Sequence, residues 1–243
     1  MSGKNLKGSI FLLIVWHVIS MNTGPLILPS PIRILNVFKD SILTGEGMLE
    51  TSITLYRFFI AYLASLSFGI LCGVWIFKNN AIKNFLWPLI TILQSTPVIS
   101  WVLLALLWFP SEVIPYFILG MFTLPVIIIS TFHGLEGTDK KLLEMARVYG
   151  VEEREVFSKI MLPSMLSSLM GGIKITVNSS LKVLATAEII GRLPRGIGGE
   201  MNTAWINIET DSLLAWTIYL IILTGLLEKL ISTAIKIKWG RYL

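Results

Sequence analysis

Two charged residues, Lys182 and Glu188, stand inside a long apolar stretch and are the side chains best placed to do chemistry. A charge at the bilayer centre costs about 2.5 to 3.5 kcal/mol, so such a residue normally faces water or a partner. On one helix the two would lie about 9 Å apart along the axis and about 120° apart around it, too far to bond. Two interpretations of Lys182 stay open. It lines a path and attracts an anionic solute, or it pairs with a carboxylate of another span or extends to the membrane surface.

Catalytic and metal-binding patterns do not emerge from the other polar residues. His17 and His133 have no Cys, Asp or Glu at the spacing of metal ligands, so we expect packing or headgroup positions for them. No glycine-rich phosphate loop followed by Lys and Ser or Thr occurs, which excludes ATP binding of the Walker kind. The sequence therefore predicts no catalytic residue, no metal and no cofactor on this chain. The single cysteine, Cys72, is expected to serve packing.

The composition indicates an all-α integral membrane protein. The 243 residues are 54% hydrophobic and 14% charged, with a mean hydropathy of +0.75, whereas soluble domains carry about 25% charged residues. Uncharged runs of more than about 20 residues suit membrane helices and lack the alternation of barrel strands. The net charge of +5 fits loops held in the cytoplasm. Because no basic stripe with interleaved aromatic residues occurs, we expect no nucleic acid partner.

Six membrane spans are predicted in a single membrane domain of residues 1–243. Lys4 and Lys7 before the first span could also belong to a cleavable signal peptide, but no small-x-small site follows, so we expect the span to be retained. The third span holds Pro88 and Pro97, and two interpretations stay open: a kink near the pathway, or prolines that serve only packing. The fifth is the most polar and should not face lipid. The spans are residues 9–23, 50–77, 84–109, 113–132, 168–191 and 212–235, with a charged loop at 133–167.

Basic residues orient these spans. In the six-span topology thirteen Lys and Arg, Arg241 among them, fall in cytoplasmic segments, and four fall outside. Because positive charge is retained inside, both termini and the charged loop are predicted to lie in the cytoplasm. Outside, Pro29 and Pro31 require extended backbone, and a short surface helix should follow at residues 32–38. The outer loop at 192–211 is rich in glycine and should be flexible.

A charged island lies between the fourth and fifth spans. The 24 residues from Glu136 to Lys159 hold 11 of the 35 charged residues, which places them in water. Apolar spacing predicts two short amphipathic helices joined by a turn, with Gly150 left-handed at the end of the first. Pro163 should stop the second helix. Such a hairpin is a surface suited to a soluble partner.

The island resembles the EAA loop of binding-protein-dependent ABC importers. The match rests on Glu144, Ala146, Gly150, Ile160, Leu162 and Pro163 at the family's spacing, with Met145 replacing the usual alanine. Further segments resemble the nitrate, sulfonate and taurine group of these permeases. They are Leu28–Pro31, Thr54–Arg57, Thr96–Trp101, the Ala187-Glu188 pair and Gly196–Gly199. Lys182 departs from the pattern, because an uncharged residue is expected there.

The resemblance implies a fold like that of type I ABC importers and a set of partners. These are a second permease copy, two cytoplasmic ATPases that carry ATP and Mg, an external substrate-binding protein and membrane lipid. It implies that the ATPase is contacted by Glu144, Met145, Ala146, Arg147, Tyr149, Gly150, Val156, Phe157, Ile160, Leu162 and Pro163. Expected path residues are Trp101, Asn178, Lys182 and Glu188, and expected docking residues for the binding protein are Arg195, Gly196, Gly198 and Glu200.

Other functions and the substrate stay open at this point. A self-sufficient secondary transporter or channel would show an inverted repeat, and no convincing repeat is visible. A membrane-embedded enzyme would need convergent His, Asp or Glu within the spans. Sulfonates, taurine, nitrate, bicarbonate-like anions and thiamine-pyrimidine precursors are all compatible with the resemblance, and Lys182 favours an anion.

Overall fold

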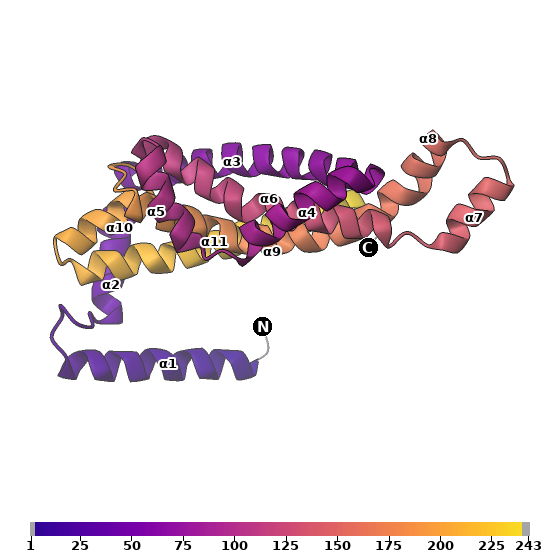
Figure 1. The fold of residues 1–243 in the computed structure, drawn as a ribbon. Helices are drawn as coiled ribbons and strands as arrows, with labels where there is room; N and C mark the ends of the chain where they lie inside the picture. The colour runs from indigo at the N-terminus through magenta and orange to yellow at the C-terminus, as the bar shows by residue number, and fades with distance from the viewer. Residues whose placement is uncertain (1–2, 240–243) are drawn as a thin grey trace. The chain divides into compact units, whose positions relative to one another are not determined.

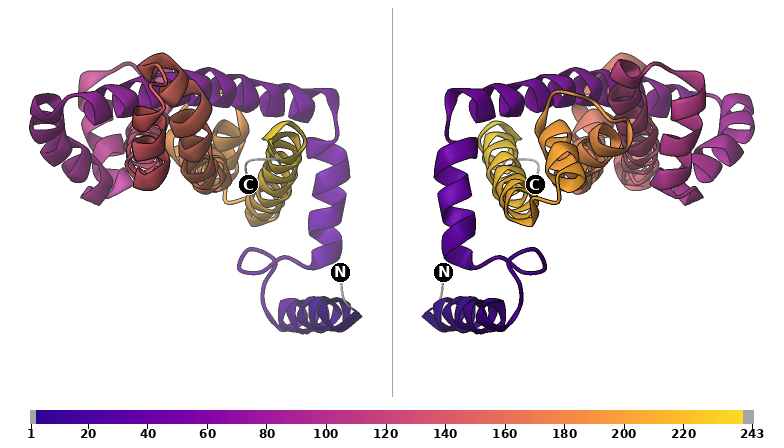
Figure 2. Two further views of the ribbon diagram at one scale, coloured as in Figure 1. Left: turned by 90° about the vertical axis from the view of Figure 1, so that its right-hand side faces the viewer. Right: turned by 90° about the vertical axis from the view of Figure 1, so that its left-hand side faces the viewer.

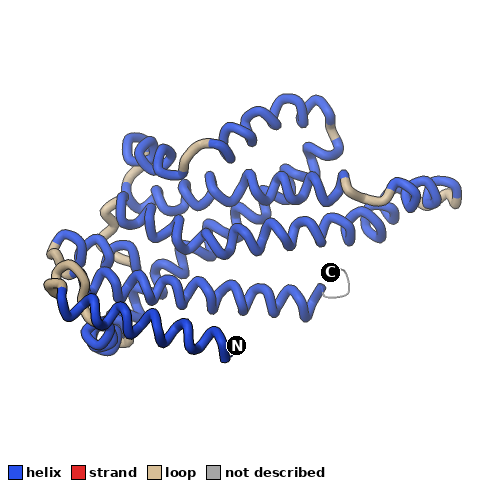
Figure 3. The backbone as a smooth tube through the Cα atoms, turned by 90° about the horizontal axis from the view of Figure 1, so that it is seen from below, coloured by secondary structure: helices blue, strands red, loops and turns tan. Residues whose placement is uncertain are grey.

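The computed structural model describes residues 3–239, which form helices and no strand (Figures 1 and 3). Within that range four helices are long and apolar enough to cross a membrane, and the number is five if the bent pair of α4 and α5 is counted as one span. A shorter apolar helix covers Phe11–Asn22 within α1. A helical element therefore stands at each of the six predicted spans. They are α1 (Gly3–Asn22), α3 (Gly45–Lys78), α4 (Asn80–Ser95) with α5 (Val98–Trp108), α6 (Ile114–Glu136), α9 (Leu162–Ile190) and α11 (Thr210–Trp239).

The chain divides into two compact units. One contains residues 1–56 and 185–222, and the other contains residues 57–184 and 223–243. Arg241, which contributed to the predicted orientation, lies outside the described residues.

Helix α6 is the centre of the second unit, because no side chain from Ile114 to Phe132 is exposed. Glycines allow its neighbours to approach closely. A Cβ on Gly73 of α3 would lie 2.6 Å from Thr131 Cβ, and one on Gly134 of α6 would lie 2.7 Å from Met165 Cα of α9. Small residues are the usual means of close helix packing in lipid, where apolar side chains gain little by leaving the solvent.

Helices α3 and α9 also meet through a buried polar contact. The hydroxyl groups of Tyr62 and Thr176 lie 2.8 Å apart, and Thr176 and Ser180 are both fully buried. Small residues at these two positions permit the close approach of the two helices. The hydrogen bond between Tyr62 and Thr176 satisfies their two hydroxyl groups, which are buried away from water.

The third predicted span is not one kinked helix. It is divided into α4 and α5, which are bent by 101° at the break. Thr96 between them is extended (φ −75°, ψ 129°) and Pro97 precedes α5, because a proline disfavours helical backbone in the residue before it. Pro88, by contrast, lies inside α4 without ending it. Where a kink within one helix was one interpretation of the sequence, the structure has a break between two helices.

The first unit begins with α1 and a turn that leads to α2 (Pro31–Val37) and a π-helical turn, η1 (Phe38–Ile42) (Figure 2). Ser30 is extended (φ −69°, ψ 151°), and its hydroxyl accepts a hydrogen bond from the Arg33 N–H at 3.4 Å. The extended backbone is therefore confirmed at Ser30 and the short helix is confirmed, but Pro31, predicted as extended, is already the first residue of the helix. Arg33 Nε also contacts Asp211 Oδ2 at 2.7 Å, which ties α2 to the start of α11.

The segment predicted as a flexible loop at 192–211 contains a helix, α10 (Ile197–Ile206). Its glycines are not sources of flexibility, because Gly198 and Gly199 are buried. A Cβ on Gly198 would lie 2.4 Å from Glu188 Cβ, and one on Gly199 would lie 2.7 Å from the Leu193 carbonyl oxygen. These glycines are needed for close packing at the start of α10.

Candidate functional site

The charged island forms the predicted helical hairpin, which projects beyond the other helices of its unit (Figure 1). Its first arm is α7 (Lys140–Val148), and Asp139 caps it by accepting a hydrogen bond from the Lys141 N–H at 2.9 Å. Gly150 is left-handed (φ 66°), as predicted, and the N–H of Val151 returns to the Ala146 carbonyl at 3.0 Å. This hydrogen bond closes the helix end and reverses the chain.

The second arm is not stopped by Pro163. It comprises α8 (Glu153–Val156) and a π-helical turn, η3 (Phe157–Met161), and it continues without interruption into α9. A proline inside a helix removes one hydrogen bond and crowds the carbonyl four residues before it, and the π turn directly before Pro163 changes which carbonyl each N–H meets. The expectation that Pro163 ends the arm is therefore wrong. The hairpin and the span that follows form one continuous helix, Glu153–Ile190.

The tip of the hairpin exposes apolar side chains to solvent. Val148 is 84% exposed, Tyr149 79% and Met145 55%. Ala146, on the opposite side of α7, is buried. Exposed apolar groups gathered on a polar hairpin mark a contact surface for another protein. We call Met145, Val148 and Tyr149 the hairpin tip.

The predicted coupling residues divide into two groups. Glu144, Arg147 and Gly150 are exposed beside the hairpin tip, whereas the members from the second arm are half-buried: Val156, Phe157, Ile160, Leu162 and Pro163. Some of the second group line a groove of about 580 Å³ that also includes Phe77 and Lys78 at the end of α3. Lys78 Nζ lies 5.0 Å from the centre of the Phe157 ring. The second arm thus packs toward α3, and the first arm presents the free surface.

A second arrangement lies at the start of α10, where three side chains bind three successive backbone N–H groups. Glu50 Oε2 accepts from Gly196 at 2.5 Å, Thr54 Oγ1 from Ile197 at 2.8 Å, and Glu188 Oε2 from Gly198 at 2.9 Å. The Thr54 hydroxyl donates to the Glu188 carboxylate at 3.0 Å. Acceptors at a helix N-terminus satisfy N–H groups that the helix leaves unpaired. We call Glu50, Thr54 and Glu188 the α10 clamp.

The clamp changes how the expected docking residues are placed. Gly196 and Gly198 are buried and bound to Glu50 and Glu188, so neither offers an exposed surface. Arg195 is half-exposed and its Nε lies 2.8 Å from Glu50 Oε1. Burial, and then the negative charge of Glu50, raises the pKa of the Glu200 carboxyl above its ordinary value, and Arg195 partly opposes this. Of the four residues, only Arg195 and Glu200 remain accessible.

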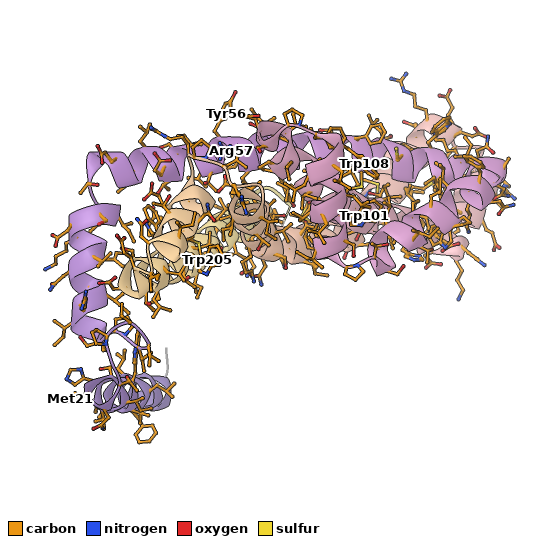
Figure 4. The ribbon with its side chains drawn as sticks, turned by 60° about the vertical axis from the view of Figure 1, so that its left-hand side comes forward. Met21, Tyr56, Arg57, Trp101, Trp108 and Trp205 are labelled. Atoms are coloured by element: carbon orange, nitrogen blue, oxygen red, sulfur yellow. The ribbon has the colours of Figure 1, made fainter. Side chains whose placement is uncertain are left out.

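Sequence reasoning missed Glu50 and Thr54 as functional residues, although Glu50 is an acid next to an apolar run. It also missed the exposed apolar side chains at the end of α10. Trp205 is 67% exposed and Ile208 is 68% exposed (Figure 4). Trp205 lines a hollow together with Arg192, so an aromatic ring and a cation lie beside each other at this end of α10.

The expected path residues do not form one site. Glu188 is fully buried in the α10 clamp, whereas Asn178 and Lys182 are exposed on α9. Trp101 of α5, labelled in Figure 4, lines a cavity of about 130 Å³ beside the Pro97 break. Neither Asn178 nor Lys182 lines that cavity.

The histidines show one contact that the sequence reasoning did not anticipate. His133 Nδ1 lies 3.3 Å from Glu136 Oε2 near the end of α6, and Lys83 Nζ lies 3.6 Å from Glu136 Oε1. In the part of the chain that the structure describes, no three His, Cys, Asp or Glu residues are grouped as metal ligands.

Comparison with solved structures gives the same fold. The chain superimposes on a subunit of the methionine ABC transporter MetNI in an inward-facing conformation, with a TM-score of 0.60 and 18% identity, over 79% of this chain and 99% of that chain. At this identity the likeness shows the fold alone, which is that of a type I ABC importer membrane subunit.

Curated relatives and a protein family also match. The chain is 30% identical over 217 residues to an aliphatic sulfonates transport permease protein of Escherichia coli, covering 89% of this chain and 82% of that protein. It is 27% identical over 215 residues to one of Bacillus subtilis (87% and 78%) and 23% identical over 228 residues to the taurine transport system permease protein of Escherichia coli (90% and 82%). Residues 65–236 match the family described as binding-protein-dependent transport system inner membrane component. The chain therefore belongs to this family of ABC transporter permeases.

Proposed function

We propose that the whole chain acts as one permease domain of an ATP-driven importer and that its hairpin tip docks on a cytoplasmic ATPase. The observation that carries this proposal is the exposed apolar tip within the EAA-like segment, where Val148 and Tyr149 are 84% and 79% exposed. A groove on a soluble ATPase would remove these side chains from water. Burying one such side chain contributes about 1.5 to 3 kcal/mol.

The continuous helix from Glu153 to Ile190 supports a mechanical role for the hairpin. A helix resists bending, so a displacement of the hairpin by the ATPase would tilt α9 as a rod. In a homodimer of permeases with two ATPases, closure of the ATPase pair around ATP and Mg would draw the two hairpins together and open the path outward. Hydrolysis on the ATPase would then reset it. This chain would supply the path and the lever, and no catalytic group.

We assign docking of an external substrate-binding protein to the surface of α10 and the residues just before it. The accessible groups there are Arg195, Glu200 and Trp205, which offer both signs of charge and an aromatic ring. This placement puts both termini and the hairpin on the cytoplasmic side of a bacterial inner membrane. It agrees with the excess of Lys and Arg on the hairpin side of the spans.

The substrate that this permease best fits is a small organic anion of the sulfonate or taurine kind. Two supports point the same way: relatives carry sulfonates and taurine in their names, and Lys182 places a cation on an exposed part of α9. A further relative, at 29% identity, is a formylaminopyrimidine permease of Halalkalibacterium halodurans, so a pyrimidine is the competing substrate class.

Capture of the partner ATPase tests the docking. The tagged full chain is expressed with the ATPase encoded beside it and purified in detergent or nanodiscs, as wild type and as Val148→Asp and Tyr149→Ala. Both positions are exposed, so the helices should fold unchanged. We expect equal copies of permease and ATPase for the wild type and a loss of ATPase for both variants.

Lys159→Ala is the matched control. Lys159 is exposed on the second arm, away from the tip, and pairs only locally with Glu155 at 2.6 Å, so this variant should retain the ATPase. Undiminished capture by Val148→Asp would refute docking at the tip. A wild-type chain that binds no ATPase and moves solute alone would make it a secondary transporter.

A further inference from the structure

One face of α9 differs in polarity from the outward faces of the neighbouring helices in its unit. Most side chains that α3 exposes between Phe59 and Trp75 are apolar and bulky, as at Leu63, Phe68 and Leu71, although Ala64 and Ser67 are exposed too. Helix α11 exposes Leu226 and Leu230 beside Lys229. On α9 the exposed positions recur every three or four residues, which places them along one side of the helix. They are Ser167, Gly171, Lys174, Ile175, Asn178 and Lys182.

This polar face is poorly suited to lipid. The helix that contains it has the lowest mean hydropathy of the four long candidate spans, 1.4 against 1.8 to 2.2, although it is the longest of them. Two lysines and an asparagine turned to acyl chains would each oppose insertion, and lysine alone costs about 2.5 to 3.5 kcal/mol at the bilayer centre. The face must therefore meet water or another polar surface.

We propose that this face lines a water-filled path and that Lys174 and Lys182 are two successive stations for an organic anion. The lysines are eight residues apart, about 12 Å along the helix, with Asn178 about 6 Å from each. That spacing is comparable with the Debye length of about 8 Å at physiological salt. An anion that leaves one lysine is therefore still attracted by the charge of the next. Asn178 offers both a donor and an acceptor between them. The inference rests on the proposed permease function and adds Lys174 to the expected path residues Asn178 and Lys182.

A charged-reagent experiment on the full transporter tests the two stations. Cys72 is the only cysteine, so the Cys72→Ala chain provides a background for Asn178→Cys. This thiol is treated in membranes with an anionic sulfonatoethyl methanethiosulfonate and a cationic trimethylammonioethyl methanethiosulfonate. The measured quantity is the ratio of the two rate constants, divided by the same ratio for a free thiol in solution.

We expect the anionic reagent to react faster than the cationic one, relative to a free thiol, and each lysine should contribute separately to this difference. A unit charge about 6 Å away in water changes each rate in opposite directions, so removing one lysine should lower the ratio about ten-fold at low salt and about three-fold at 0.15 M salt. Lys174→Gln and Lys182→Gln should each produce this loss, and the corresponding Arg variants should not. Leu226→Cys, on the apolar face of α11, should react with neither reagent.

Two results would overturn the proposal. An Asn178→Cys thiol that reacts with neither reagent would show that the face is not in water. A reactive thiol whose ratio is unchanged by Lys174→Gln and Lys182→Gln would show a wet path without anion stations. Capture of the ATPase reads only the hairpin, and the thiol ratio reads only the α9 face, so the two proposals can fail separately.

Discussion

Replacing Thr54 by valine should release the start of α10 while leaving the shape of the core unchanged. Thr54 is fully buried, and its hydroxyl is a link in the α10 clamp. It accepts the Ile197 N–H at 2.8 Å and donates to Glu188 Oε2 at 3.0 Å. Valine has nearly the same volume, so Thr54→Val removes these two hydrogen bonds without creating a cavity.

The expected cost follows from those two contacts. A hydrogen bond to a charged group contributes about 1.5 to 3 kcal/mol, and a buried N–H left without an acceptor costs about 1 to 3 kcal/mol. Because the two losses share one hydroxyl, we expect a total of about 2 to 4 kcal/mol for local opening of the first turn of α10. At about 1.36 kcal/mol per factor of ten, amide exchange there should become roughly thirty-fold to one-thousand-fold faster.

Hydrogen–deuterium exchange of the purified chain in nanodiscs measures this change. The peptide of interest covers residues 196–201, and a peptide from α7 serves as an internal reference. Thr217→Val is the matched control, because its hydroxyl donates only to the Leu213 carbonyl within α11, at 2.7 Å. If Thr54→Val and Thr217→Val gave the same exchange at residues 196–201, the clamp would not hold α10.

Three further predictions concern packing, the hairpin and pH. Gly73→Ala should lower the melting temperature in detergent, because its Cβ would lie 2.6 Å from Thr131 Cβ and overpacking costs about 1 to 3 kcal/mol. Gly171→Ala is the control, because a Cβ there would meet nothing within 4 Å. An equal melting temperature for the two variants would contradict the close α3–α6 contact. Gly150→Ala should reduce ATPase capture at an unchanged melting temperature. A residue with a Cβ is strained by about 1 to 2 kcal/mol at the φ of 66° that Gly150 adopts, and this strain falls on the hairpin alone. Full capture by the variant would argue against a rigid turn. Stability should fall as pH rises from the ordinary Glu200 pKa of 4.5 through its raised folded value, because the folded chain holds that proton more tightly than the unfolded chain. The melting temperature of the wild type should therefore fall with pH across this range relative to that of Glu200→Gln. Parallel curves of melting temperature against pH would exclude the effect.

Much of the hairpin could be predicted from local sequence. The concentration of charge at Glu136–Lys159 forced the segment into water, and Gly150 is the residue type that a left-handed helix end favours. Pro163 was misread because the π turn at Phe157–Met161, which directly precedes it in the helix, is not visible as a sequence pattern. The lever formed by the second arm and α9 was therefore not foreseen.

The prolines of the third span show a similar limit. Pro88 and Pro97 both lie in apolar surroundings, and sequence reasoning could expect at most a kink. The structure continues through Pro88 and breaks at Pro97 with a bend of 101°. A proline removes one N–H wherever it stands. Whether the chain then bends or breaks depends on the packing around the freed carbonyl groups, which is not a local property.

The sequence by itself determined the membrane class, the helical spans and the exposed hairpin, because hydropathy, charge and turn preference act over a few residues. It also indicated that α9 is unusually polar. Only the tertiary structure decided that Gly69 and Gly73 pack against α6 and that Glu50, Thr54 and Glu188 meet the backbone of α10. Thr54 and Glu188 are 134 residues apart, and Glu50 and Gly196 are 146 apart. No periodicity links such distant positions, and they come together because buried acids and helix ends must satisfy each other where water is absent.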